Sequence, residues 1–271
     1  MMRAAVLGSP IAHSLSPVIH QTAYRILEFE GEYTRFELSS DALPGFLNQK
    51  LAENWRGFSL TMPLKETVLP LLNSIDPKAS VIASVNTVIN RSGEWHGLST
   101  DMVGFERVFA NLDISRVALI GGGGTARAAV GALANRVPSI HTFLRTSSRR
   151  DALQRAAGET LIEAIEMSGE WTHQLNNYDL VISTVPSGVI STEACVELVP
   201  TGLLCEVLYH PWPTPLASAW QRSGLPIIDG IDLLVEQALE QIALFTERDF
   251  DRDDMRTRLL AVAREAQQAR L

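Results

Sequence analysis

Short apolar runs and helical apolar stripes alternate along the first hundred residues of the chain. The run at 4–7 predicts a strand, and the apolar positions of 17–27 fall on one side of a helix. A second strand is predicted over 33–38, and 85–97 is typical of a hairpin that turns at 91–93. The first part of the chain is therefore expected to form an α/β domain.

The stretch 57–63, GFSLTMP, alternates strictly between apolar and polar residues, which is the period of a half-buried strand. One face is expected to hold Phe58, Leu60 and Met62, and the other Ser59 and Thr61. Lys65 follows two residues after Pro63, just beyond this strand.

From residue 116 onward the pattern becomes more regular. Near-continuous apolar runs separated by helical segments predict a parallel sheet that is covered on both faces, as in a Rossmann-type domain. The expected strands are 116–120, 139–144, 179–184, 202–209 and 226–230. Two further helices are expected over 232–246 and 253–268.

These elements predict two domains rather than one. Residues 1–101, completed by the helices of 232–271, are expected to form an N-terminal α/β domain. Residues 102–231 are expected to form the Rossmann-type dinucleotide-binding domain, with a cleft between the two.

Composition narrows the class of protein. The 271 residues are 46% hydrophobic and 20% charged, with a net charge of −8 and no basic run longer than Arg149-Arg150, which argues against a nucleic-acid partner. No apolar run approaches the length of a membrane span, and no His or Cys pair has metal-ligand spacing, so neither a membrane partner nor a metal is expected. The only cysteines, Cys195 and Cys205, are expected to be buried thiols of a cytoplasmic protein.

A glycine-rich turn provides the first functional signal. Gly121, Gly123 and Ala126 follow a predicted strand and open a predicted helix, which matches the dinucleotide fingerprint G-x-G-x-x-G/A. Such glycines let the backbone approach a pyrophosphate at the helix N-terminus. A glycine run by itself can equally be a tight turn between a strand and a helix, so the next strand matters.

The end of that next strand favours NADP over NAD. An NAD site would place an acidic residue there, about 20 residues after the glycines, for the ribose hydroxyls. The sequence instead offers Arg145, Thr146 and Arg149, with no carboxylate before Asp151. A guanidinium group binds phosphate oxygens with paired hydrogen bonds, so NADP is the better interpretation than a solvated basic loop.

Polar residues near the strand ends of the first domain suggest proton chemistry. A lone lysine is normally a surface charge, but Lys65 shares its region with Ser59, Thr61, Asn86 and the STD segment that ends at Asp101. A hydride transfer needs a group that gives or takes the alcohol proton, and a lysine beside an aspartate can serve. Burial and the carboxylate shift the lysine pKa in opposite directions, and the sequence leaves open which effect is larger.

The segment GSPIAHSLSP, residues 8–17, links the first strand to the first helix. Ser16 is a suitable N-cap and Pro17 a suitable first helical residue. This interpretation gives no role to Ser14.

Seven segments together identify a resemblance that none carries singly: GSPIAHSLSP, LTMPLK, VNTV, TDMVGF, GGGGTARAA, YHPWPTPL and GIDLLVEQA. In this order, over nearly the whole length, the chain resembles shikimate dehydrogenases. The resemblance implies reversible reduction of 3-dehydroshikimate to shikimate with NADPH, in aromatic amino-acid biosynthesis. It also implies a substrate domain and a Rossmann domain with the reacting centres in the cleft.

The resemblance also assigns residues. Lys65 and Asp101 match the catalytic lysine and its partner, and Ser14 with Ser16 would hold the substrate carboxylate at the start of a helix. The expected substrate-binding residues are Ser14, Ser16, Ser59, Thr61, Asn86, Tyr209 and Gln237. The expected cofactor-binding residues are Gly121, Gly122, Gly123, Gly124, Thr125, Ala126, Arg145, Thr146, Arg149, Thr184 and Gly230.

Several positions depart from the common pattern of the family. Ser59 and Ser99 stand where the family often has Asn, Leu144 where an Asn commonly precedes the arginine, and Gly122 where Ala is common. Two alternatives therefore remain open: a quinate/shikimate dehydrogenase with relaxed substrate or cofactor choice, and a non-catalytic relative that senses shikimate. The expected partner is a small-molecule substrate, with the protein a monomer or a homodimer.

Overall fold

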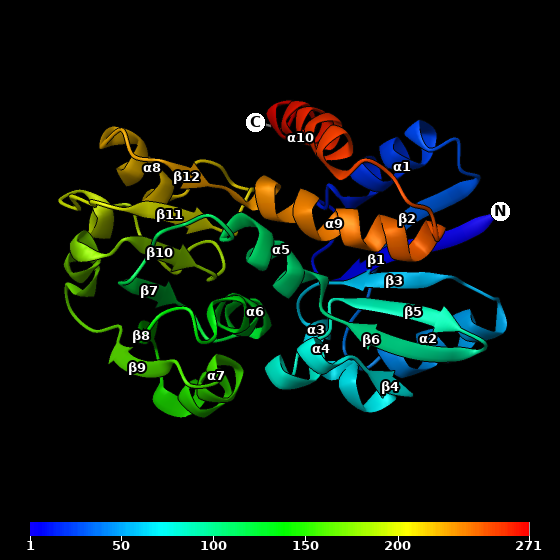
Figure 1. Cartoon of the computed structure of the whole chain (residues 1–271), viewed down its shortest axis with the longest axis horizontal. Helices are drawn as coiled ribbons and strands as arrows, with labels where there is room; N and C mark the ends of the chain where they lie inside the picture. Colours follow the sequence, from blue (N-terminus) through cyan, green and yellow to red (C-terminus); the bar gives the residue numbers. More distant parts are fainter. Residues whose placement is uncertain (271) are drawn as a thin grey trace. The chain divides into compact units, whose positions relative to one another are not determined.

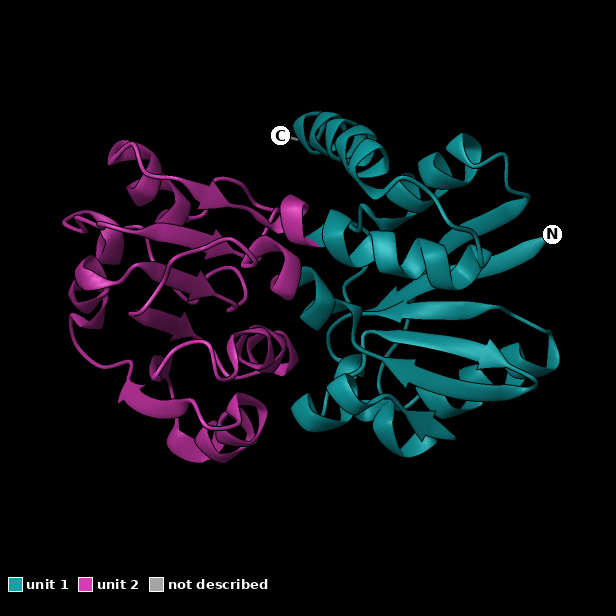
Figure 2. Cartoon of the chain, in the orientation of Figure 1, with its two compact units in different colours: residues 1–104, 234–270 teal, residues 105–233, 271 magenta. Residues whose placement is uncertain are grey.

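A computed structural model describes residues 1–270 of the chain. They form two compact units, one from residues 1–104 with 234–270 and one from residues 105–233 (Figure 2). The chain passes from one unit to the other within two helices, α5 (Thr100–Val108) and α9 (Gly230–Thr246). Leu271, the last residue of the segment that was expected to complete the first domain, lies outside the described residues.

The first unit is built on a six-stranded mixed sheet with the order β2-β1-β3-β5-β6-β4. Parallel pairing joins β1 to β2 and β3, and the predicted hairpin is the antiparallel pair β5 and β6. The strands are β1 (Met2–Gly8), β2 (Gly31–Glu37), β3 (Gly57–Leu60), β4 (Ser74–Ile75), β5 (Thr87–Arg91) and β6 (Glu94–Leu98). The parallel pairing of β1 and β3 brings the segments that follow these two strands to the same edge of the sheet.

Alternate residues of β1 enter two hydrophobic cores, one on each face of this sheet. Ala4 and Val6 pack with side chains of α1 and α9, whereas Ala5 and Leu7 pack with side chains of α2, α3 and α4. The helices of this unit besides α5 and α9 are α1 (Ser16–Ile26), α2 (Leu43–Ala52), α3 (Leu64–Thr67), α4 (Pro77–Ile82) and α10 (Arg252–Gln268), which packs on α1 (Figure 1). The expected α/β architecture is confirmed.

The alternation predicted for 57–63 holds only as far as the strand itself. Phe58 and Leu60 are buried in the core beneath α2 and α3, and Ser59 lies on the opposite face. Met62 is 55% exposed, so its predicted place on the apolar face is wrong. The strand ends at Leu60 and the chain turns into α3, which breaks the period of two before Met62 is reached.

The second unit contains the predicted parallel sheet. All six strands run parallel in the order β12-β11-β10-β7-β8-β9, the strand order of a doubly wound dinucleotide-binding fold. They are β7 (Val117–Ile120), β8 (Ser139–Leu144), β9 (Leu161–Glu166), β10 (Leu180–Ser183), β11 (Leu203–Glu206) and β12 (Ile227–Ile228). The sequence pattern missed β9, an edge strand that buries only Ile162 fully.

Three helices flank this second sheet: α6 (Gly124–Leu133), α7 (Arg150–Ala157) and α8 (Pro215–Arg222). Leu216 and Trp220 of α8 belong to the same hydrophobic core as Ala118 and Ile120 of the central strand β7. Short 3₁₀ turns at 69–71, 147–149, 171–177 and 193–195 complete the described elements of the chain. Between residues 1 and 270, no helix has both the length and the apolar character needed to cross a membrane.

Candidate active site

Lys65 and Asp101 form an ion pair in the first unit. Lys65 lies in α3, one turn beyond β3, and its Nζ donates to Asp101 Oδ2 over 2.6 Å. Asp101 lies in the first turn of α5, where the helix dipole favours a carboxylate. Each side chain is 16% exposed, so the pair is largely shielded from solvent but still accessible.

Asn86 fixes the other oxygen of that carboxylate. Its Nδ2 donates to Asp101 Oδ1 over 2.8 Å and to Thr100 Oγ1 over 2.9 Å, and its Oδ1 accepts from the Thr100 backbone N–H over 2.7 Å. The Asn86 side chain is only 3% exposed. A buried amide bound at both ends cannot rotate freely, so it holds Asp101 in one orientation.

Gln237 joins the same cluster from α9. Its Oε1 lies 3.3 Å from Asn86 Nδ2, and its Nε2 donates to the Leu234 carbonyl over 2.8 Å. The structure therefore brings together four of the predicted site residues from separate segments of the first unit: Lys65 of α3, Asp101 of α5, Gln237 of α9, and Asn86, which directly precedes β5.

The segment that carries Thr61 lies beside the start of the segment 8–17, which carries Ser14 and Ser16. The Thr61 backbone N–H donates to the Leu7 carbonyl over 2.9 Å, and the Ser9 N–H donates to the Met62 carbonyl over 2.9 Å. A Cβ atom at Gly8 would collide with the Thr61 side chain and the Met62 carbonyl, so this close approach requires glycine. Thr61 itself is partly buried.

Ser16 is not the N-cap of α1, and this prediction is wrong. Leu15 already adopts helical backbone angles and occupies the cap position, so Ser16 lies within the first turn and Pro17 follows it. The Ser14 hydroxyl accepts from the Ser16 backbone N–H over 3.3 Å. The buried Ser16 side chain instead hydrogen-bonds to Tyr33.

Ser59 is buried between two polar partners. Its hydroxyl lies 2.5 Å from the Tyr33 hydroxyl and donates to Gln241 Oε1 over 2.7 Å. Gln241 in turn donates to Thr87 and Thr100, which links Ser59 to the Asn86 cluster.

Five members of this network were not predicted: His20, Tyr33, Thr87, Thr100 and Gln241. Gln241 follows Gln237 by four residues on one helix, so the helical period gave a usable signal for it. Thr100 belongs to the STD segment, but His20 and Tyr33 give no local signal because their partners lie far away in the sequence.

Burial controls the ionisation of two of these groups. Complete burial lowers the pKa of His20 to about 3, partly opposed by its hydrogen bond to Gln241, so the imidazole is neutral near pH 7. Burial likewise raises the pKa of the Tyr33 phenol. Both side chains therefore act as neutral hydrogen-bonding groups.

The glycine turn of the second unit has the features of a phosphate-binding loop. Gly121 adopts a φ of +112°, which favours glycine, and α6 begins directly after Gly123. No heavy atom lies within 4 Å of a Cβ atom built at Gly123, so the backbone there faces open space. Gly124, Thr125 and Ala126 form the first turn of α6, whose backbone N–H groups favour an anion.

Two further predicted cofactor residues lie against this turn. A Cβ atom at Gly122 would meet the Arg149 Cβ at 2.8 Å, and the Thr184 hydroxyl donates to the Ile120 carbonyl over 2.9 Å. Arg145, Thr146 and Arg149 are all exposed beyond the end of β8. The donors present fit a dinucleotide that carries an additional phosphate.

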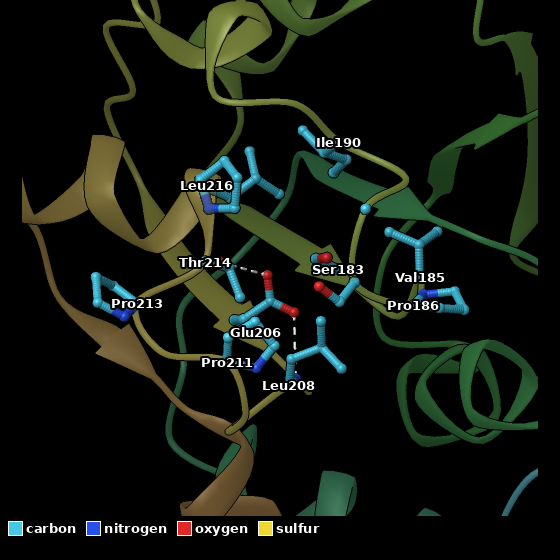
Figure 3. A pocket seen from close by; sticks show the side chains of 13 residues that line it. Ser183, Val185, Pro186, Ile190, Glu206, Leu208, Pro211, Pro213, Thr214 and Leu216 are labelled. Atoms are coloured by element: carbon cyan, nitrogen blue, oxygen red, sulfur yellow. Dashed lines mark hydrogen bonds between the residues drawn. The ribbon is translucent and has the colours of Figure 1, made fainter. Parts of the chain in front are cut away.

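The segment after β11 contributes Leu208 and Pro211 to the lining of a small pocket of about 50 Å³, which does not include the predicted site residue Tyr209 (Figure 3). Glu206 lines this pocket and is only 2% exposed; it accepts from the Leu208 N–H over 3.2 Å and from the Thr214 hydroxyl over 3.0 Å. Burial raises the pKa of this carboxyl group to about 7. Tyr209, three residues beyond Glu206, is partly buried.

Gly230 packs against the same loop. A Cβ atom at Gly230, the first residue of α9, would collide with the Val207 carbonyl and the Leu208 backbone. The structure thus brings Gly230 close to the segment that leads to Tyr209. Among residues 1–270, no group of three or more His, Cys, Asp or Glu side chains could hold a metal ion.

Comparison with known proteins gives a consistent result. Residues 6–88 match the shikimate dehydrogenase substrate binding domain. The chain is 29% identical to the shikimate dehydrogenase (NADP(+)) of Staphylococcus aureus strain Newman, over 96% of this chain and 98% of that one.

Solved structures extend the similarity to the whole fold. Shikimate dehydrogenase of Mycobacterium tuberculosis is 31% identical with a TM-score of 0.84, over 96% of this chain and 99% of that one. The enzyme of Thermus thermophilus, solved with NADP(H) and shikimate, is 30% identical with a TM-score of 0.80, over 98% of this chain and 100% of that one. Sequence identity at this level over nearly complete chains shows that this protein belongs to the shikimate dehydrogenase family.

Proposed function

We propose that this protein is an NADP-dependent oxidoreductase that interconverts 3-dehydroshikimate and shikimate in aromatic amino-acid biosynthesis. The observation that carries the proposal is the ion pair between Lys65 and Asp101, whose carboxylate is held in turn by Asn86. Membership of the shikimate dehydrogenase family and the glycine turn at the start of α6 support it.

We assign the substrate to the first unit and the nucleotide to the second. Ser14 and Ser16 bind the substrate carboxylate at the N-terminus of α1, where a negative charge is favoured. Thr61, Asn86 and Gln237 bind the ring hydroxyls, and Ser59 and Tyr209 complete the set of substrate-binding residues.

Lys65 is the proton donor and acceptor of the reaction. In the direction of reduction, the ammonium group gives a proton to the C3 oxygen as the carbonyl becomes an alcohol, and the reverse reaction returns it. Asp101 keeps Lys65 in place and accepts a hydrogen bond from a ring hydroxyl. Because Asn86 binds the second oxygen of Asp101, the carboxylate is oriented before the substrate arrives.

The cofactor residues divide into two groups. Gly121, Gly122, Gly123, Gly124, Thr125 and Ala126 hold the pyrophosphate, and Arg145, Thr146 and Arg149 hold the 2′-phosphate of the adenosine. Thr184 and Gly230 complete the site. When bound, NADPH supplies the hydride for C3 of the substrate.

We also propose the cytoplasm as the compartment, because Cys195 and Cys205 are free thiols and both are buried. Shikimate and the nicotinamide nucleotide are the expected partners, and the active form is a monomer or a homodimer.

The test is an assay of nicotinamide absorbance with shikimate and with quinate, each with NADP and with NAD. We expect the highest kcat/KM for shikimate with NADP. A preference for NAD would overturn the cofactor assignment, and a preference for quinate would overturn the substrate. Shikimate binding without turnover in any combination would show a sensing protein rather than an enzyme.

A further inference from the structure

Gln241 uses every hydrogen-bonding position of its side chain inside the first unit. It lies on α9, four residues after Gln237, and is completely buried. Its Oε1 accepts from Ser59 over 2.7 Å and faces His20 Nε2 at 3.2 Å. Its Nε2 donates to Thr87 over 2.8 Å and to Thr100 over 3.2 Å.

The amide of Gln241 determines the direction of the hydrogen bonds around it. Its carbonyl oxygen can only accept, so the Ser59 hydroxyl donates to it and is left to accept from Tyr33. For the same reason, Nε2 of His20 carries the proton of the neutral ring. On the other side the amide donates, which leaves the Thr100 hydroxyl to donate to Asn86 Oδ1 at 3.2 Å.

The line of hydrogen bonds therefore connects two parts of the site. One end is Tyr33, which hydrogen-bonds to Ser16, and the other end is Asn86, which binds Asp101 and through it Lys65. The Gln241 side chain joins the two halves of this line by hydrogen bonds, with Ser59 on one side and Thr100 on the other.

We propose that Gln241 is a positioning residue that sets the geometry of the Lys65 and Asp101 pair through Thr100 and Asn86. This inference rests on the proposed function in taking that pair as the reacting groups. Gln241 does not contact the substrate because it is completely buried; it orients the side chains that do.

The first experiment replaces Gln241 by methionine, which has a similar shape and no hydrogen-bonding amide. We expect kcat with shikimate to fall about tenfold or more while KM for NADP stays within about twofold, because the assigned nucleotide residues belong to the other unit. The matched control is Ile242→Val, a buried change at the next position of α9 that leaves the network intact. A folded Gln241→Met protein with wild-type kcat would overturn the proposal.

A second readout does not depend on turnover. The chain has three lysines, Lys50, Lys65 and Lys78, so ¹³C reductive methylation gives three lysine side-chain NMR signals that can be assigned by substitution. We expect Gln241→Met to shift the Lys65 signal and to leave those of Lys50 and Lys78 unchanged. An unchanged Lys65 signal would overturn the proposal, whatever the wild-type protein proves to catalyse.

If Gln241→Met does not fold, Gln241→Glu keeps the shape of the side chain and is measured in both ways. Its carboxylate accepts where the amide donated, so the hydroxyls of Thr87 and Thr100 must reverse their hydrogen bonds. For Gln241→Glu we expect the same loss of kcat and the same shift of the Lys65 signal as for Gln241→Met. Absence of both effects would overturn the proposal. Absence of wild-type turnover with shikimate would refute the proposed function but not the positioning role, because the NMR comparison remains valid.

Discussion

The Tyr33 ring stacks on the His20 imidazole, with centroids 3.9 Å apart and planes inclined by 9°. His20 thus has an aromatic neighbour on its face and the Gln241 carbonyl at its edge. Burial removes the water that would solvate a positive charge on the ring, and the Gln241 carbonyl offsets only part of that loss, so the pKa of His20 is lowered to about 3.

Acid should destabilise the protein through His20. Its pKa is about 6.5 in an unfolded chain and about 3 in the folded one. Below pH 6.5 the unfolded state therefore binds a proton that the folded state does not, and stability falls as the pH falls. The His20 contribution is about 3 kcal/mol at pH 4.5.

Urea unfolding at pH 4.5 and pH 7.5 tests this expectation. His20→Gln should lose less stability than the wild type between the two values, whereas the exposed His13→Gln should behave as the wild type. An equal loss of stability in the His20→Gln and wild-type proteins would contradict the assignment.

Glu206 should change the stability of the protein with pH in the direction opposite to His20. Its pKa is raised from 4.5 to about 7, so between these values the folded state keeps a proton that the unfolded state has lost. Stability from this group therefore decreases as the pH rises from about 4.5 to 7, by about 3 kcal/mol at most. Glu206→Gln should remove that decrease, as measured by thermal unfolding at pH 5 and pH 8. A variant with the same pH dependence as the wild type would show that Glu206 does not titrate in this range.

Lys65→Ala should lower kcat by about 10²- to 10⁴-fold, because it removes the group that transfers the proton at the C3 oxygen. The Michaelis constants should change less, since substrate binding relies on other side chains. Steady-state kinetics with shikimate and NADP measures both quantities. Lys78→Ala, an exposed lysine on α4, serves as the control. Undiminished turnover in Lys65→Ala would remove Lys65 from the mechanism.

Ser14→Ala should raise KM for shikimate about tenfold, as expected for the loss of one hydroxyl bond to a carboxylate. Thermal stability should hardly change, because Ser14 is only partly buried and its hydrogen bond to the Ser16 N–H is 3.3 Å long. The exposed Ser80→Ala should change neither quantity. Normal shikimate binding by Ser14→Ala would refute the carboxylate assignment.

Arg149→Ala should weaken NADP binding by about 10- to 100-fold and NAD binding far less, because only NADP offers the additional phosphate. Titration of both nucleotides by calorimetry measures the difference. Arg155→Ala removes an exposed charge from α7 and tests whether net charge alone explains the result. Equal weakening of both nucleotides would place Arg149 outside the 2′-phosphate site.

The sequence predicted the second unit better than the first because its strands are buried on both faces. Runs such as VALI and LVIS leave little choice of secondary structure, whereas β9 alternates at a sheet edge and was missed. In the first unit, the helix α2 was not predicted, because only Leu43 and Leu47 of its ten residues are buried. The prediction of Ser16 as the N-cap was wrong because the helical backbone angles at Leu15 place the start of α1 one residue earlier.

The candidate site was predictable where a polar residue interrupts an apolar pattern. Asn86 lies between Val85 and Val88 in a largely apolar segment, and Lys65 follows a strand end, so both were identified. Of the partners of Gln241, His20 and Thr87 were not identified, because His20 lies 221 residues away along the chain and Thr87 lies 154 residues away. Only the folded sheet and helix α9 bring such residues together.

In the line of side chains from Tyr33 to Asn86, each group donates its hydrogen bond to the next group in the same direction. This shared direction limits which amino-acid substitutions the enzyme can accept. A substitution that reverses one donor leaves its neighbour facing another donor or another lone pair, so the effects of two changes along the line will not add. A harmful substitution at Ser59 can be compensated by a second substitution at Tyr33 or Gln241. Each of the two substitutions would be harmful without the other. Libraries that aim to alter ring recognition in this protein should therefore vary these positions in pairs.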